Sequence, residues 1–388
     1  MWGIAGGFAM SRRDDVKRVL DGKKPEYVPW FGDLDYWLSY LKAERMIPDA
    51  YAAMGRGNLS GGLTDDGLQK LHKDLEVGFY LQAYFPFKTI YHNVEEEVLE
   101  NERERIIRYK TPYGNLQEVW KYVDSTYSFA PVEFMIKDAG DLKAFRYLYE
   151  NVEYVPDYEL AEKRLQSVGD NGIVLAYTPK SPMMELVALK AGLETVVLEL
   201  MNEEPEEFEE LLECMEEKHT TATKIAIDSP AECIFVPDNL SSEMVGGNLY
   251  DTYIQKVHED WTGLIKKAGK KSMVHLDGTL NPLLHKLSCA GFDVIEAVTP
   301  SPVGDIELED LRKHVLENTI IWGGIPSGFF DESYSEEEFE AWVCRALKIM
   351  RKDHRFVLGV GDQVVPNTTV TRVKKVAELV KKYGKFEG

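Results

Sequence analysis

The sequence predicts an α/β protein built on a barrel of eight parallel strands. Short apolar runs rich in β-branched residues alternate with long helical patterns, as in a chain of strands and crossover helices. The last six runs are apolar nearly throughout, as expected for strands covered on both faces. Eight runs can be counted, and eight strands close a (β/α)8 barrel, or TIM barrel. They span 28–31, 78–85, 172–177, 232–236, 271–275, 292–298, 319–323 and 356–359.

The predicted helices have recognisable starts and ends. Residues 188–200 and 203–228 are long and amphipathic, and Pro205 stands near the start of the second, where its missing N–H costs nothing. Ser335, followed by three glutamates, predicts a helix start with a serine cap and acids in the first turn. Residues 370–383 are expected to form the last helix.

Residues 88–135 do not fit the alternation. The segments 105–109 and 116–120 have strand-like content, and the Thr-Pro-Tyr-Gly-Asn sequence between them is a turn signal. We expect a β-hairpin inserted after strand two, which covers the barrel mouth or builds an interface and so leaves a homodimer open. The predicted organisation is one barrel domain over 1–388, with an N-terminal extension of about 1–25 and the insertion at about 88–135.

Composition narrows the function classes. A formal net charge of −21 argues against nucleic acid and anionic membranes as partners, because both require a basic face. No apolar run reaches the roughly 18 residues that span a membrane, and residues 1–9 lack the basic start of a secretory signal. Widely spaced cysteines indicate a reducing compartment, so we expect a cytoplasmic protein. The four cysteines, expected to be mostly small core residues, are Cys214, Cys233, Cys289 and Cys344.

Acidic residues recur at five of the eight predicted strand ends, where barrel enzymes place their catalytic groups. His275 and Asp277 are the sharpest pair, because residues two apart on a strand point to the same side and reach one ion or one substrate atom. The alternative interpretations are solvated loop carboxylates and a buried His–Asp pair. The five acids are Asp33, Asp238, Asp277, Glu296 and Asp362.

Aromatic side chains gather at the same strand ends and are suited to walling a pocket for a flat substrate. The alternative is that they are ordinary core or lid aromatics. The aromatic candidates are Trp30, Phe31, Tyr36, Trp37, Tyr84 and Tyr177. The predicted substrate-binding set is Trp30, Asp33, Trp37, Tyr84, Lys180 and Asn239.

Several stretches resemble the uroporphyrinogen decarboxylase superfamily. They are VHLDG at 274–278, GFDVIEAVTP at 291–300, WGGIP at 322–326 and FVLGVGD at 356–362. The opening at 12–30 also fits, and the similarity is strongest from about 172 onward. The resemblance implies the barrel fold. In the decarboxylase branch an arginine-rich segment follows strand one, whereas 30–37 reads WFGDLDYW, with two acids and no arginine. This segment would repel a polyanionic porphyrinogen.

The second branch of that superfamily comprises cobamide-dependent methyltransferases. Its thiol-methylating members bind zinc through an HxC motif and a later cysteine, and the matching positions here are His275, Asp277 and Asp362. The replacement of both cysteines by aspartate puts thiol methylation in doubt. Zinc also accepts oxygen ligands, and such a site would be a stronger Lewis acid towards an ether or hydroxyl oxygen. Glu296 is a candidate additional ligand, and Asp238 a candidate acid or substrate contact.

The leading hypothesis is therefore a methyltransferase that removes a methyl group from a methoxylated substrate, with aromatic compounds included, and passes it to a corrinoid on a partner protein. The expected zinc ligands are His275, Asp277, Glu296 and Asp362, and the expected catalytic residues are His275, Asp238 and Tyr177. The second hypothesis is a metal-independent decarboxylase or lyase for a small carboxylic acid, with Lys180 or His275 as general acid. The third is a barrel that binds a ligand or protein without catalysis.

Overall fold

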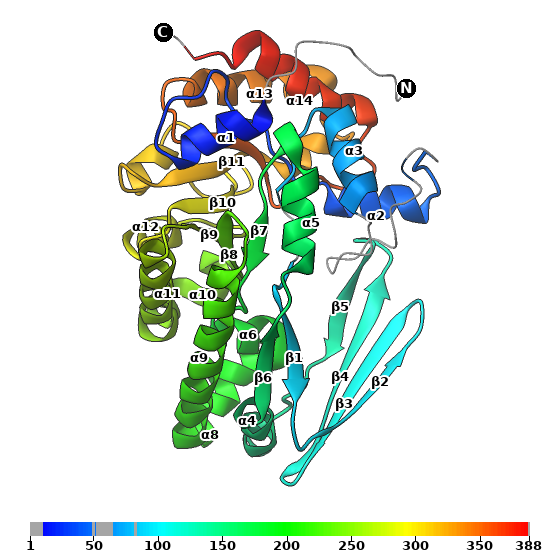
Figure 1. Cartoon of the computed structure of the whole chain (residues 1–388), viewed down its shortest axis with the longest axis vertical. Helices are drawn as coiled ribbons and strands as arrows, with labels where there is room; N and C mark the ends of the chain where they lie inside the picture. The colour runs from blue at the N-terminus through cyan, green and yellow to red at the C-terminus, as the bar shows by residue number, and fades with distance from the viewer. Residues whose placement is uncertain (1–10, 49–50, 52–64, 81–83, 387–388) are drawn as a thin grey trace.

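A six-stranded parallel sheet forms the centre of the computed structural model, which describes residues 11–48, 51, 65–80 and 84–386. The strand order is β12-β11-β10-β9-β8-β7, so strands adjacent in the chain are neighbours in the sheet (Figure 1). All the strand pairs are parallel, and most side chains are buried on both faces, as the apolar runs predict. The strands are β7 (Leu175–Tyr177), β8 (Cys233–Leu240), β9 (Lys271–Leu276), β10 (Val294–Val298), β11 (Ile320–Pro326) and β12 (Phe356–Gly361).

Two short extended segments, at 28–31 and 77–80, join the edges of this sheet. They correspond to the first two predicted strands, of which residues 81–83 lie outside the described part of the chain. The first segment bridges to β12 in parallel, and the second bridges to Gly172 just before β7. Eight extended segments therefore form a closed ring, as the barrel prediction requires. The closing hydrogen bonds run from Phe31 to Leu358 (2.9 Å), from Gly78 to Trp30 (2.9 Å) and from Ile173 to Phe79 (3.0 Å).

Helices cover the outside of the ring. The predicted long helix is α9, the serine-capped helix is α13, and the last helix is α14 at its predicted bounds. Ser335 and Glu338 form a reciprocal capping box at the start of α13. The principal helices are α1 (Arg12–Leu20), α2 (Asp35–Ala43), α3 (Asp65–Leu75), α4 (Leu142–Glu150), α5 (Glu159–Ser167), α6 (Pro182–Glu185), α9 (Pro205–Asp228), α10 (Ser242–Leu249), α11 (Gln255–Lys267), α12 (Leu283–Cys289), α13 (Glu336–Met350) and α14 (Val370–Tyr383).

The prediction of one helix over 188–200 is wrong. This region consists of a short π-helix at Leu186–Lys190, the short helix α7 (Leu193–Thr195), a second short π-helix at Val196–Leu200 and the short helix α8 (Met201–Glu203). Gly192 has a φ of 82°, a left-handed conformation that interrupts the helix and that glycine adopts at little cost. Amphipathic periodicity does not report such a break.

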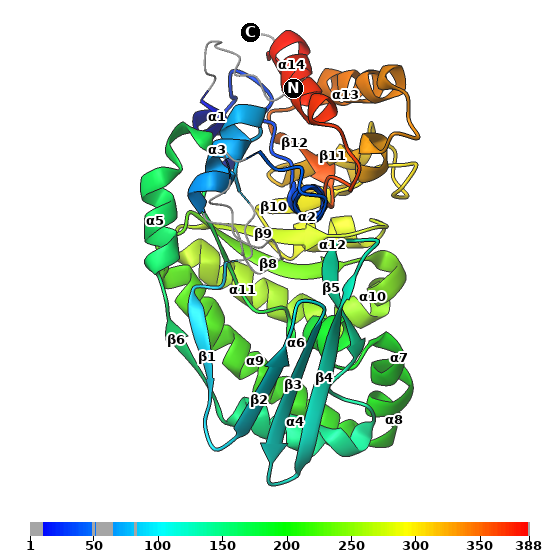
Figure 2. The same cartoon turned by 90° about the vertical axis from the view of Figure 1, so that its right-hand side faces the viewer.

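The insertion is larger than the predicted hairpin. That hairpin exists as β3 (Glu104–Thr111) and β4 (Gly114–Val123), and it is extended by β2 (Glu95–Glu100) and β5 (Ser128–Glu133) into a four-stranded antiparallel sheet. A separate ribbon pairs β1 (Phe87–Tyr91) with β6 (Val152–Pro156). The four-stranded sheet lies beside α4, at the end of the molecule opposite to α13 and α14 (Figure 2).

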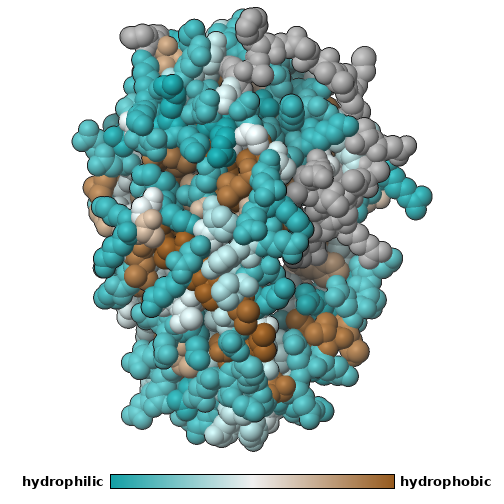
Figure 3. Space-filling view, viewed as in Figure 1, coloured by the Kyte–Doolittle hydropathy of each residue, from teal (hydrophilic) through white to brown (hydrophobic). Residues whose placement is uncertain are grey.

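The expectations drawn from composition hold in part for the surface and for the cysteines. Hydrophilic residues cover most of the face in Figure 3, and among the described helices none is long and apolar enough to cross a membrane. All four cysteines are free, but the expectation of core positions holds only for Cys233, since Cys214 and Cys344 are half-buried and Cys289 is exposed. The prediction about residues 1–9 lies outside the described residues.

Replacing Gly172 with alanine is expected to destabilise the fold. A Cβ atom there would lie 1.8 Å from the carbonyl oxygen of Phe79, so the backbone that closes the barrel would have to move. Such overpacking costs about 1–3 kcal/mol, measured as a lower midpoint of urea denaturation. Gly263→Ala is the matched control, because nothing lies within 4 Å of that added Cβ in α11. It is expected to stabilise by about 0.5–1 kcal/mol. Equal effects of the two variants would contradict the role of Gly172 in closure.

Candidate active site

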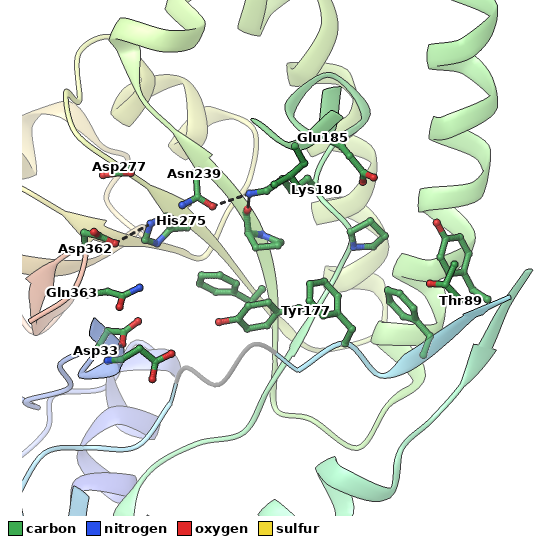
Figure 4. A pocket seen from close by; sticks show the side chains of 18 of the residues that line it. Asp33, Thr89, Tyr177, Lys180, Glu185, Asn239, His275, Asp277, Asp362 and Gln363 are labelled. Carbon is green, nitrogen blue, oxygen red and sulfur yellow. Dashed lines mark hydrogen bonds and ion pairs between the residues drawn. The ribbon is translucent and has the colours of Figure 1, made fainter. Parts of the chain in front are cut away.

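A cavity of about 620 Å³ opens at the carboxyl ends of the central strands (Figure 4). This size suits a small organic molecule, and barrel enzymes place their active sites at this end. The lining combines carboxylates, one histidine, one lysine and many aromatic rings. It comprises Asp33, Asp35, Tyr36, Phe85, Phe87, Thr89, Tyr91, Tyr149, Tyr154, Tyr177, Pro179, Lys180, Glu185, Leu189, Phe235, Pro237, Asn239, His275, Asp277, Asp362 and Gln363.

His275, near the end of β9, is held by a buried carboxylate. Its Nδ1 atom lies 2.6 Å from Glu296 Oε2, and these two residues are register partners on the adjacent strands β9 and β10. The other oxygen of Glu296 accepts a hydrogen bond from the Tyr80 hydroxyl at 2.9 Å. All three side chains are buried. The ring orientation of His275 is therefore fixed from behind.

The Nε2 atom of His275 is turned towards the cavity. It is buried and has no hydrogen-bond partner among the described residues. Asp362 Oδ1 lies 3.8 Å from this nitrogen, and Asp277 lines the same end of the cavity (Figure 4). The structure thus brings the predicted residues His275, Asp277 and Asp362 together at one cavity. A buried nitrogen without a partner is a position that a ligand or ion would fill.

The protonation of this end follows from burial and charge. Burial alone lowers the pKa of His275, but the charge and hydrogen bond of Glu296 and the charge of Asp362 raise it to about 9. Burial raises the pKa of Asp362 to about 6, although His275 opposes the shift. Burial and the neighbouring Asp35 raise the pKa of Asp33 well above its usual value, and burial raises that of Asp35 to about 6. The site therefore concentrates groups that exchange protons near neutral pH.

Local backbone geometry directs these side chains. Asp362 follows β12 with a φ of 69°, and Asn239 in β8 has a φ of 53°, both in the left-handed region. Ala297 has a φ of 61° directly after Glu296, where the register between β10 and β11 shifts. Residues other than glycine adopt this conformation at a cost that surrounding structure must offset, and such positions cluster at functional sites. Here three of them border the cavity or its buried support.

A continuous line of aromatic rings leads away from His275. Phe235 is 6.3 Å from the His275 ring and 4.6 Å from Tyr177, which is 5.6 Å from Phe85, measured between ring centroids. Phe87 continues the line at 5.9 Å from Phe85 and 5.1 Å from Tyr154. Of the six predicted aromatic residues, Tyr177 and Tyr36 belong to the aromatic lining of the cavity. Most of its other members come from β8 and from the β1–β6 ribbon.

Three aromatic residues predicted to bind substrate do not line the cavity. Trp30 is buried and stacks on Phe330. Trp37 is buried and donates its indole N–H to the Thr368 carbonyl at 2.7 Å, and the Tyr84 hydroxyl donates to the Asp157 carbonyl at 2.6 Å. Phe31 packs in the barrel interior against Trp322. These residues are core aromatics, which was the alternative interpretation of their pattern.

Asp238 also does not reach the cavity. Its side chain is fully buried and accepts hydrogen bonds from the backbone and hydroxyl of Ser181, both at 2.7 Å, with His258 Nε2 at 2.8 Å. It therefore fixes the loop after β7 and does not line the cavity, so it is placed to support the site and not to contact substrate directly. The next residues on that wall do line the cavity. Lys180 donates to Asn239 Oδ1 at 2.7 Å and to the Pro237 carbonyl.

Several lining residues had no local signal in the sequence. Tyr91, Phe87 and Tyr154 belong to the β1–β6 ribbon, and Tyr149 and Glu185 end up beside it from α4 and α6. Their approach to the barrel mouth depends on pairing between segments about 60 residues apart. Gln363 follows Asp362 and accepts a hydrogen bond from the Tyr36 backbone at 3.0 Å; it was not among the predicted site residues.

A family model for uroporphyrinogen decarboxylase (URO-D) matches residues 181–383, which is more than half of the chain. The chain belongs to the uroporphyrinogen decarboxylase family. The matched region contains β8 to β12 and thus Asp238, His275, Asp277, Glu296 and Asp362. The predicted superfamily is confirmed.

Solved structures resemble this uroporphyrinogen decarboxylase family member in fold. A methyltransferase from Methanosarcina mazei superposes with a TM-score of 0.60 at 12% identity, covering 97% of this chain and 99% of that chain. A GH18 chitinase from Flavobacterium johnsoniae reaches a TM-score of only 0.32 at 10% identity, over 62% of this chain and 91% of that one. No curated protein sequence matches significantly. The first similarity supports the same overall fold, and the second is too low to inform the comparison.

Replacing Asp238 with alanine is expected to cost roughly 3–5 kcal/mol of stability, because His258 and Ser181 would lose a buried charged partner. Burial acts to raise the pKa of Asp238, but His258, Lys180 and Ser181 together lower it below its ordinary value. Its contribution is thus present above the unfolded pKa of about 3.9 and lost only as pH falls through the lower folded value. The loss in the variant should be constant between pH 5 and 8, measured by chemical denaturation.

The control for that variant is Asp251→Ala. Asp251 pairs with Lys286 at the surface, where one ion pair contributes less than about 1 kcal/mol. Similar losses in the two variants would contradict a supporting role specific to Asp238.

Proposed function

We propose that the protein is a methyltransferase that takes a methyl group from a methylated substrate, methoxylated aromatic compounds foremost, and passes it to a corrinoid carried by a partner protein. One observation carries the proposal. His275 presents a bare Nε2 to an aromatic-walled cavity, and its other nitrogen is fixed by Glu296. Membership of the uroporphyrinogen decarboxylase family and the fold shared with a methyltransferase support it.

The donor chemistry of the site fits zinc. Nitrogen from His275 and oxygens from Asp277 and Asp362 are ligands that zinc accepts, and a carboxylate behind a ligating histidine is a common support. Within the described residues no three such side chains stand close enough together to hold an ion as a preformed group. The residues that would hold zinc are His275, Asp277 and Asp362. Glu296 would act through His275, because its two oxygens already serve Tyr80 and His275.

Bound zinc would supply a Lewis acid for the oxygen that carries the methyl group. The residues of the chain would position the substrate for this step. The rings of Phe235 and Tyr177 offer a flat apolar surface next to His275, which would position an aromatic substrate and exclude water from the methyl group.

The decarboxylase alternative finds less support. The cavity lining has five carboxylates, Asp33, Asp35, Glu185, Asp277 and Asp362, against the two basic groups Lys180 and His275. A small carboxylic acid would enter this site as an anion and be repelled unless several of these groups were protonated. Lys180, whose pKa burial lowers to about 8, remains a proton donor that such a reaction could use. A neutral or cationic methylated substrate suits the charge balance better.

Purified protein is expected to contain about one zinc per chain, and His275→Ala is expected to lose it. His92→Ala is the matched control, because His92 is an exposed histidine that pairs with Glu153 and does not itself line the cavity. Elemental analysis after zinc-replete purification measures both. Zinc-free wild type and control would sink the zinc part of the proposal.

Glu296→Gln is expected to lower methyl transfer by about 10–100-fold, the range for residues that orient a metal ligand. The amide keeps the size of the side chain but removes the charge that fixes Nδ1 of His275. Transfer is measured as conversion of cob(I)amide to methylcob(III)amide by absorbance, with a methoxylated aromatic donor. Loss of carbon dioxide from a carboxylic acid substrate without any corrinoid change would instead support the alternative.

A further inference from the structure

The cavity has a second chemical end, distant from His275. Glu185 and Thr89 lie at one side of Figure 4, Asp362 and Asp33 at the other, and Tyr177 between them. The line of aromatic rings described above connects the two ends in steps of 4.6 to 6.3 Å between centroids. A substrate whose methyl group lies at His275 would therefore extend along this wall towards Glu185.

Glu185 is a carboxylate set among aromatic rings. It is the last residue of α6 and lines the cavity, with a side chain 15% exposed. One oxygen accepts the Tyr149 hydroxyl at 2.7 Å, and the other lies 3.5 Å from His219 Nε2. The rings that line the same end are those of Phe87, Tyr91, Tyr149 and Tyr154. A carboxylate has about four acceptor positions, so these contacts leave room for a further donor.

No lysine or arginine among the described residues forms an ion pair with Glu185. Burial lowers the pKa of His219, so its imidazole is neutral at neutral pH. Burial also raises the pKa of Tyr149 well above its ordinary value, which keeps its hydroxyl protonated. Lys190 acts on Glu185 electrostatically, but it makes its ion pair with Glu118 at 3.0 Å. Lys180 also lines the cavity and acts on Glu185 electrostatically, but it donates to Asn239 Oδ1 and to the Pro237 carbonyl. Both lysines are thus engaged by other acceptors, and the carboxylate of Glu185 has no directly paired lysine within the described part of the chain.

We propose that this end of the cavity binds an ammonium group, and that the substrate is an aromatic amine that carries its transferable methyl group at the opposite end of the molecule. A cation gains from ring faces and from a hydrogen bond and charge attraction to a partly buried carboxylate. A hydroxyl tail can donate a hydrogen bond to that carboxylate but lacks the positive charge, and a carboxylate tail gains neither interaction. A volume of about 620 Å³ holds an aromatic ring with a short aminoalkyl chain. The assignment of the methyl end rests on the proposed function; the ammonium end rests on Glu185 and the rings around it.

The test is calorimetric binding to the purified protein, without corrinoid and without turnover. Three ligands share a para-methoxyphenyl ring and a two-carbon chain that ends in ammonium, hydroxyl or carboxylate. The amine is expected to bind at least about 10-fold more tightly than the alcohol, and the carboxylate more weakly than both. Equal affinities, or no measurable binding of the amine, would overturn the proposal.

Glu185→Gln isolates the charge, since the amide still accepts the Tyr149 hydroxyl. It is expected to weaken the amine about 10-fold or more and to leave the alcohol within about twofold, which also shows that the variant is folded. Glu194→Gln, an exposed acid outside the cavity, is the matched control and should change neither. An unchanged preference in Glu185→Gln would refute the ammonium site. Phenethylamine, which lacks the methoxy group, separates the two proposals. If it binds tightly and this binding needs Glu185, while the methoxylated amine gives no methyl transfer, only the proposed function is rejected.

Discussion

The closing of the strand ring is the constraint on which the site depends. The carboxyl ends of β7, β8, β9 and β12 surround one cavity only because the segments at 28–31 and 77–80 join the two edges of the six-stranded sheet. That junction is tight, since the carbonyl of Phe79 occupies the space where a side chain at position 172 would begin. Closure places Asp33, after the first segment, in the same cavity as Asp362 after β12. Residues more than 300 positions apart thereby form one electrostatic unit.

That unit has an unusual balance of charge. Burial raises the pKa of Asp33, Asp35 and Asp362, while the carboxylate of Glu296 raises that of His275. Neighbouring acids add to the shifts of Asp33 and Asp362, so these carboxylates stabilise positive charge nearby. A cation close to His275 would relieve this repulsion, and an anion would increase it.

Sequence reasoning predicted the parts of the fold and site that are set by local pattern. Apolar runs marked β8 to β12 to within a few residues, and the spacing of His275 and Asp277 marked one wall of the cavity. It failed where long-range packing decides. Trp30, Trp37 and Tyr84 have the composition of a pocket wall, yet each packs into the core. Asp238 stands at a strand end like Asp362, but the position of His258 in α11 turns it into a buried support. The contacts that bury these side chains come from distant parts of the chain, so the local sequence does not reveal them.

The two ends of the cavity come from different parts of the architecture. The reactive end is carried by the central strands, inside the region that matches the family model, and its key side chains are fixed by hydrogen bonds between neighbouring strands. The other end is built by the β1–β6 ribbon and by Tyr149 and Glu185, of which only Glu185 lies within that region. A barrel can keep its chemistry at the strand ends while segments laid across its mouth change what is recognised. In this chain the end proposed to transfer the methyl group and the end proposed to bind ammonium can therefore vary independently, because they share only the aromatic wall between them.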